Sequence, residues 1–298
     1  MPCLKRIITF CLTFVFSLSL HLLAAQASTL KKIPVFVSIL PQAFFVEKIG
    51  GDRVEVEVLV QPGQNPHTYA PTPRQMTRLA EARVYFRIGV VFENAFIPKI
   101  KNSLPHLLIV DTRQGIELEK MTGHEEDHRD HGEELDPHIW LDPLLVKKQA
   151  KIIKDTLVQL DPAGQSLYEK NFTAFSADLD ALHARLTKAL APLRGKSFFV
   201  FHPAFGYFAK AYGLKQIAVE TGGNSPSARH LAGLIESAQK NGVRVLFVQP
   251  QFSQKSAETV ARAINGAVVA LDPLARDYFT NMTSIAQALE KALGAVAK

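Results

Sequence analysis

Short runs of β-branched and aromatic residues alternate with longer amphipathic stretches along most of the chain. In the first half the short runs are IPVFVSIL, VEVEVLV, VYFRIGV and LLIVD, which begin at residues 33, 54, 84 and 107. Residues 42–49 and 73–82, which lie between such runs, suit helices. Buried strands have this composition, and strands that alternate with helices form parallel sheets. The first half therefore predicts an α/β lobe.

The same alternation resumes after residue 196. The predicted strands are SFFVF, QIAVE, RVLFVQP and AVVALDP, which begin at residues 197, 216, 244 and 267. The predicted helices cover residues 203–212, 227–241, 253–264 and 283–296. We therefore expect a second α/β lobe on the same plan, again with a parallel sheet flanked by helices.

The two halves are separated by a helical region without strand signals. An amphipathic stretch over residues 143–160 ends at Asp161-Pro162, and a second follows over residues 164–193. A stripe of apolar residues along the second stretch is formed by Leu167, Phe172, Phe175, Leu179, Leu182, Leu186 and Leu190. At 1.5 Å per residue this helix would be about 45 Å long, which predicts a rigid connection between lobes. The expected division is 28–162 for the first lobe, 163–194 for the connecting helix and 195–298 for the second lobe.

The first residues predict export. Lys5 and Arg6 precede an apolar run over residues 7–23, and Ala25-Gln26-Ala27 has the small-x-small pattern of a signal peptidase site. Residues 1–27 are therefore interpreted as a cleaved signal peptide, which places the mature protein in the periplasm. The alternative is an uncleaved membrane anchor, which the cleavage pattern and the polar residues inside the run disfavour.

Composition and charge narrow the function further. Apolar residues make up 47% of the chain and charged residues 21%, as in ordinary globular proteins. Both cysteines, Cys3 and Cys11, lie in the predicted signal peptide, so the mature chain has no disulfide and no thiolate metal ligand. Without residues 1–27 there are 32 basic and 28 acidic residues, a formal charge of +4. The basic residues are scattered and not arranged in a stripe, so no nucleic-acid partner is expected.

Two candidate metal ligands lie in proline-rich segments of the first half. His67 is in NPHTYAPTP, where three prolines restrict the backbone, and His138 is in DPHIWLDP, just before a helix that Asp142 can cap. Each has a plain alternative. His67 can be a surface histidine in a turn, and His138 can be a buried histidine with its hydrogen bonds satisfied.

Two more candidates follow strands of the second half. His202 comes directly after SFFVF, and Asp272 follows AVVAL, although an Asp-Pro pair can also simply start a turn. Ligands of α/β proteins bind beyond the carboxyl ends of the strands, so one cation between the lobes could contact all four side chains. Three imidazoles and one carboxylate suit Zn²⁺, whereas Mn²⁺ would favour more oxygen ligands. We expect such a site to lose metal below about pH 6 as its histidines are protonated.

A charged segment over residues 123–134, GHEEDHRDHGEE, contains three further histidines. His124, His128 and His131 are spaced by four and three residues, so a helix ordered by metal would place them on one face. The alternative is a solvated charge run. The segment is interpreted as an auxiliary, weak metal site at most.

Four motifs together resemble a known family. NPHTYAPTP, DPHIWLDP, FHPAFGYFA and ALDPL, in this order, resemble the periplasmic metal-binding proteins of zinc and manganese ABC importers, specifically the zinc-uptake (ZnuA-like) branch. The resemblance implies two lobes joined by one long helix, with the metal between them. It places the ligands on His67, His138, His202 and, where a protein ligand is used, Asp272. It also implies a monomeric carrier that delivers zinc to the membrane permease. The segment 123–134 is short for this branch, and the second-half cysteine pair of some members is missing.

Two other classes of function compete with this one. A hydrolytic zinc enzyme needs an open coordination position and a general base, and the chain has no His-Glu-x-x-His motif. A surface adhesin could use metal only to stabilise its fold. No catalytic residue is therefore assigned.

Overall fold

The computed structural model describes residues 32–121, 135–219, 245–252 and 254–294, together with positions 232, 233, 235, 236, 238 and 243. The predicted signal peptide, the segment 123–134 and most of the predicted helix 227–241 lie outside these residues. The fold is that of one compact unit that begins at Ile33. In the part of the chain that is described, every helix is too short or too polar to cross a membrane.

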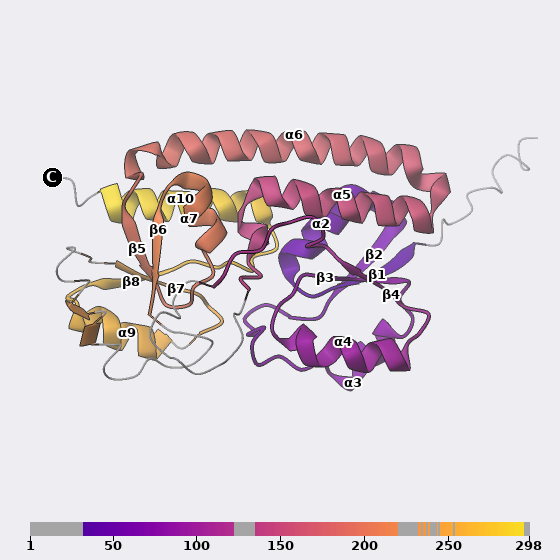
Figure 1. The fold of residues 1–298 in the computed structure, drawn as a ribbon, viewed down its shortest axis with the longest axis horizontal. Helices are drawn as coiled ribbons and strands as arrows, with labels where there is room; N and C mark the ends of the chain where they lie inside the picture. The colour runs from indigo at the N-terminus through magenta and orange to yellow at the C-terminus, as the bar shows by residue number, and fades with distance from the viewer. Residues whose placement is uncertain are drawn as a thin grey trace, which may run out of the picture. The chain divides into compact units, whose positions relative to one another are not determined.

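The first lobe is built on a parallel sheet of four strands, as predicted (Figure 1). The strands are β1 (Ile33–Val37), β2 (Val54–Val58), β3 (Val84–Arg87) and β4 (Leu108–Asp111), in the order β2-β1-β3-β4. The helices that follow the first three strands are α2 (Leu40–Gly50), α3 (Pro73–Leu79) and α4 (Phe92–Ser103). The sequence did not single out α4, which contains Pro98. Its buried face, which includes Phe96, Ile97 and Ile100, holds it in place despite the proline.

The second lobe repeats this plan with a second parallel sheet. Its strands are β5 (Ser197–Val200), β6 (Lys215–Ala218), β7 (Val245–Val248) and β8 (Ala267–Ala270), in the order β6-β5-β7-β8. The described helices of this lobe are α7 (Gly206–Tyr212), α9 (Gln254–Ala263) and α10 (Tyr278–Gly294). In each sheet the second strand lies on one side of the first strand, and the third and fourth strands lie on its other side. Such a change of side leaves a crevice at the strand ends, so we expect one at the carboxyl ends of β1 and β5.

Two helices of the second lobe begin elsewhere than predicted. α10 begins five residues earlier than expected because Asp277 caps it, accepting a hydrogen bond from Thr280 N at 3.2 Å. α7 begins three residues later, because residues 202–205 form a turn in which Ala204 N donates to His202 O at 2.8 Å. The turn keeps His202 outside the helix and at the end of its strand.

One long helix connects the lobes, as expected. α5 (Pro143–Leu160) ends at a turn, and α6 (Gln165–Leu190) runs along α5 and α2 on one side and reaches α10 and α7 on the other (Figure 1). Its 26 residues correspond to about 39 Å. The buried stripe includes Tyr168, whereas Leu167, which the sequence assigned to it, is 38% exposed. Successive residues of an α-helix point about 100° apart, so Leu167 and Tyr168 cannot both face the core. The buried residues that follow, from Phe175 to Leu190, lie on the same face of the helix as Tyr168.

A charged cluster fixes the turn between α5 and α6. Arg53 Nε and Nη2 donate to the two carboxylate oxygens of Asp161 at 2.6 and 2.9 Å, and Tyr168 OH donates to the same carboxylate at 2.6 Å. The Arg53 hydrogen bond is the main reason that the pKa of Asp161 lies below its usual range. The start of the connecting helix is thereby tied to the first lobe.

Aromatic side chains of α2, α6 and α10 join the lobes. Phe44 and Phe45 of α2, Phe175 of α6, and Tyr278 and Phe279 of α10 pack with ring centroids between 5.1 and 6.5 Å apart. They belong to one hydrophobic core that continues from the first sheet to α10. A wide opening of the lobes would have to separate these rings, so this core limits hinge motion.

Candidate metal-binding pocket

The loop that carries His67 is held by hydrogen bonds of its own. Asn65 Oδ1 accepts from His67 N at 2.9 Å, which forms an Asx turn. Beyond the histidine, Gln75 Nε2 donates to Leu59 O at 2.7 Å and Gln75 Oε1 accepts from Tyr69 OH at 2.8 Å. Side-chain bonds at both ends therefore position the imidazole, in addition to the prolines noted in the sequence.

His138 is oriented by the aspartate two residues before it. Asp136 Oδ1 accepts from His138 N at 2.9 Å and from His138 Nδ1 at 2.6 Å. With Nδ1 donating to a carboxylate, the ring presents Nε2 as the nitrogen that can bind a metal. Asp136 itself lies against Gly206, where a Cβ would be only 2.8 Å from Asp136 Oδ2. The predicted cap of α5 is confirmed, since Asp142 Oδ1 accepts from Leu144 N at 2.8 Å.

His202 is held by the segment that follows β7. The buried Gln249 side chain pairs with the His202 backbone, accepting from His202 N at 3.1 Å and donating to His202 O at 2.7 Å. Phe252 stacks on the imidazole with a centroid distance of 4.7 Å and an interplanar angle of 22°. Both the backbone and the ring plane of His202 are thus fixed.

The three histidines meet in one pocket between the two sheets. His67 Nε2 lies 3.3 Å from His202 Nε2, and the His138 and His202 ring centroids are 5.3 Å apart. The pocket is lined by Pro66, His67, Val90, Val91, Pro137, His138, Trp140, His202, Gln251, Phe252, Pro273 and Leu274. Apolar walls around a few polar groups are typical of ligand sites.

The spacing of the first two imidazoles matches a tetrahedral zinc ion. With Zn–N bonds of about 2.0–2.1 Å, two ligand nitrogens are about 3.3 Å apart, and the His67 and His202 Nε2 atoms are separated by 3.3 Å. The set is not complete as it stands, because no three His, Cys, Asp or Glu side chains among the described residues are already grouped to hold a metal ion. A metal would therefore have to bring the three rings closer together.

Electrostatics keep His67 uncharged. Burial, and then the nearby His202 and His138 rings, lower the pKa of His67 to about 3. The imidazole is therefore neutral at pH 7, which is the form that binds a metal.

Asp272 lies beside the pocket and is absent from the residues that line it. Its Oδ1 accepts from Gln251 Nε2 at 2.8 Å and from Leu274 N at 2.9 Å. The next residue, Pro273, accepts a hydrogen bond at its carbonyl from Trp140 Nε1 at 2.7 Å. The structure thus brings the three histidines together and places Asp272 one residue away from the wall. His124, His128 and His131 lie outside the described residues.

The sequence did not single out several residues that line the pocket or hold its histidines. Gln249 follows the apolar run of β7 just as His202 follows that of β5, so the rule about strand ends could have found it. Asp136 was visible only as part of the DPHIWLDP motif. Neither Gln251 nor Phe252 carries a local signal, because their roles depend on contacts with distant residues.

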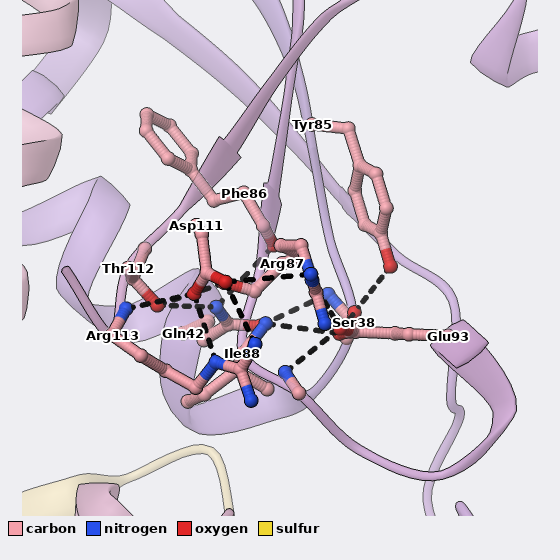
Figure 2. Close-up of polar contacts among 11 residues, drawn as sticks. Ser38, Gln42, Tyr85, Phe86, Arg87, Ile88, Glu93, Asp111, Thr112 and Arg113 are labelled. Carbon is pink, nitrogen blue, oxygen red and sulfur yellow. Dashed lines mark hydrogen bonds and ion pairs between the residues drawn. The ribbon is translucent and has the colours of Figure 1, made fainter. Parts of the chain in front are cut away.

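A buried polar network around Glu93 (Figure 2) lies next in the chain to Val90 and Val91, which line the pocket. Glu93, which is fully buried, accepts hydrogen bonds from Ile88 N at 2.9 Å and Gly89 N at 2.7 Å. Arg87 Nε donates to the same carboxylate at 3.0 Å. These bonds close the loop that leads from β3 into α4 and hold the two valines against the pocket.

Ser38 extends this network to the end of β1 (Figure 2). Its hydroxyl donates to Glu93 Oε1 at 2.5 Å, so the Tyr85 hydroxyl, also 2.5 Å away, is the donor to Ser38. Burial, and secondarily the charge of Glu93, raises the pKa of Tyr85, which keeps this proton in place. Glycine is favoured at position 89, because its φ of +90° is one that L side chains rarely adopt.

The fold and the pocket define a two-lobed binding protein with a histidine-lined site between the lobes. A family model described as the periplasmic component A of a zinc-uptake complex (ZnuA) matches residues 35–292. The chain therefore belongs to the ZnuA family. This is a family of metal-binding components of transport systems.

Relatives and solved structures agree with this placement. The high-affinity zinc uptake system protein ZnuA of Bacillus subtilis is 32% identical over 254 residues, which are 82% of this chain and 79% of that protein. The zinc-binding lipoprotein AdcA of Streptococcus pneumoniae is 30% identical over 256 residues. The match covers 82% of this chain and 50% of AdcA. A zinc-bound deletion mutant of ZnuA is 42% identical and superposes with a TM-score of 0.82 over 88% of this chain and 98% of its own.

Proposed function

We propose that this protein binds zinc in the periplasm and delivers it to the membrane permease of an ABC importer. The observation that carries the proposal is the convergence of three imidazoles, with the Nε2 atoms of His67 and His202 at the 3.3 Å spacing of zinc ligands. The zinc-uptake relatives and the zinc-bound structural neighbour support it. The ligands would be His67, His138 and His202, with Asp272 or a water molecule in the fourth position.

The transport cycle proposed here is binding and release without covalent chemistry. Hydrogen bonds hold the backbone or the ring of each histidine near its place, so zinc binding has only to bring the three rings closer together and loses little of its free energy to ordering. Three nitrogen ligands favour zinc over manganese. We propose that residues 28–162 and 195–298 act as the two lobes, and that the helix over 163–194, packed against both, restricts their movement.

Zinc stoichiometry tests this function directly. Chelator competition would be measured on the leaderless protein, residues 28–298, with and without residues 123–134. We expect one tightly bound zinc to remain after the deletion, and Mn²⁺ to compete only weakly, because the primary site is the histidine pocket. Loss of tight binding on deletion would move the site to the charged segment. Tighter binding of manganese than zinc at pH 7 would contradict the assignment of the metal.

The zinc affinity should fall less steeply with decreasing pH than it would for a site made of three histidines with ordinary pKa values. For each ligand imidazole with a pKa of about 6.5, competition by protons weakens metal binding about 25-fold when the pH falls from 7 to 5. The pKa of His67 is lowered to about 3, so protons do not compete for this ligand in that range. We therefore expect the logarithm of the zinc affinity to change by no more than two per pH unit between pH 6 and pH 5. A slope near three would show that all three ligands are protonated in the free protein.

A further inference from the structure

A tyrosine of the second lobe is inserted into a backbone pairing of the first. Glu119 and Asp136 lie opposite each other beside the antiparallel bridge between Lys120 and Leu135, and Asp136 N donates to Glu119 O at 2.8 Å. In a regular antiparallel pair Glu119 N would donate directly to Asp136 O. Here the Tyr207 hydroxyl stands between these two atoms, accepting from Glu119 N at 2.9 Å and donating to Asp136 O at 3.1 Å.

The hydroxyl can make both bonds because it keeps its proton. Burial is the main reason that the pKa of Tyr207 is raised to about 12, so at pH 7 the group is one donor and one acceptor. Asp136 is buried as well, which makes bulk water a poor substitute for this hydroxyl. The backbone of Asp136 is therefore tied to α7 of the second lobe.

Asp136 carries this constraint to one of the three histidines. Its Oδ1 accepts from His138 N at 2.9 Å and from His138 Nδ1 at 2.6 Å, so the imidazole follows any displacement of Asp136. Tyr207 belongs to the helix that begins just after the turn at His202. One short segment of the second lobe thus contains His202 and also holds the residue that orients His138.

We propose that Tyr207 is a positioning residue of the zinc site, and that its hydroxyl sets the place of His138 relative to His202 by holding Asp136. The inference rests on the proposed zinc-binding function and adds a residue to its site. Without the hydroxyl, Glu119 N and Asp136 O can pair directly, as in a regular ladder. The backbone then keeps its hydrogen bonds, but Asp136 is drawn towards Glu119 and takes the His138 ring with it.

The zinc affinity and the Co²⁺ spectrum of Tyr207→Phe test the proposal, with Tyr212→Phe as the matched control. Tyr212 is a buried tyrosine of the same helix, and its hydroxyl lies 3.4 Å from His183 Nδ1. By chelator competition we expect Tyr207→Phe to raise the Kd for zinc about 10-fold. This is the lower end of the range for outer-shell partners, because Tyr207 is one step further from the metal than Asp136. The visible spectrum of the Co²⁺-loaded Tyr207→Phe protein should shift, since it reports the ligand geometry, whereas Tyr212→Phe should change neither quantity.

A second background tests whether the effect passes through Asp136. Asp136→Ala removes the carboxylate that holds the His138 ring and should by itself raise the Kd for zinc about 10–100-fold. In that background Tyr207→Phe should change the Kd by less than about twofold, because the hydroxyl no longer has a path to the imidazole.

Two other outcomes would overturn the proposal. If Tyr207 only stabilises the fold, Tyr207→Phe lowers the unfolding temperature of the metal-free protein, and its Kd and Co²⁺ spectrum match those of Tyr212→Phe. If Tyr207 acts through His202 instead, the full loss of affinity persists in the Asp136→Ala background. Failure of the underlying function is distinguishable, because the unmodified protein would then bind no zinc tightly.

Discussion

Replacement of His202 by alanine is expected to weaken zinc binding by more than about 100-fold, beyond what the loss of an outer-shell partner costs. The His202 ring lies between the other two, with ring centroids 4.7 Å from His67 and 5.3 Å from His138. Its removal takes away one of the two nitrogens whose spacing fits zinc, and two imidazoles alone bind the ion poorly. Chelator competition at pH 7.5 would measure the change.

A surface histidine provides the matched control for this variant. His106 is exposed, and its Nε2 lies 2.9 Å from the Ala80 carbonyl oxygen, so His106→Ala should leave the zinc affinity unchanged. The fold of His202→Ala should survive, because the alanine keeps the backbone bonds with Gln249. A folded His202→Ala variant whose Kd for zinc lies within threefold of that of the unmodified protein would contradict the assignment of the pocket.

Replacement of Glu93 by alanine is expected to lower the free energy of unfolding of the metal-free protein by about 3–5 kcal/mol. The change leaves Ile88 N, Gly89 N and Ser38 Oγ without the acceptor that they share. Each buried donor that loses its partner costs about 1–3 kcal/mol, and the side chain leaves a void. Urea unfolding with an unchanged m-value would measure the effect.

The control for Glu93 is an exposed glutamate. Glu290 is exposed on α10, and Glu290→Ala should change the free energy of unfolding by no more than about 0.5 kcal/mol. Glu93→Gln should fall between the two, because it keeps the shape and one carbonyl acceptor. A loss below about 1 kcal/mol in Glu93→Ala would mean that water replaces the carboxylate, and that the loop over residues 88–91 does not depend on it.

The architecture could be predicted because its signals are local. Each apolar run marks a strand, and each strand is followed by a helix, which is sufficient to require parallel sheets. The same reasoning placed His202 at the end of β5 and Asp142 at the start of α5. The long connecting helix followed from its apolar spacing, and only the phase of its first turn, Tyr168 in place of Leu167, differed.

Other features depend on residues that are distant along the chain. α4 keeps Pro98 in its interior because its buried face packs against the first sheet, which a local rule against proline cannot anticipate. Glu93, 55 residues from Ser38, becomes a structural acceptor only when β1 and β3 lie side by side.

By itself the sequence determined the two α/β lobes, the long helix between them and the histidines that end up in one pocket, because periodicity and strand ends are properties of short segments. Only the tertiary structure decided which groups orient those histidines. Asp136, Gln249 and Phe252 reach their rings or backbones, and Asp272 is paired with Gln251 at the side of the pocket. Hydrogen bonds and ring contacts act over a few ångströms, so these pairings exist only after the sheets and the connecting helix have brought the segments together.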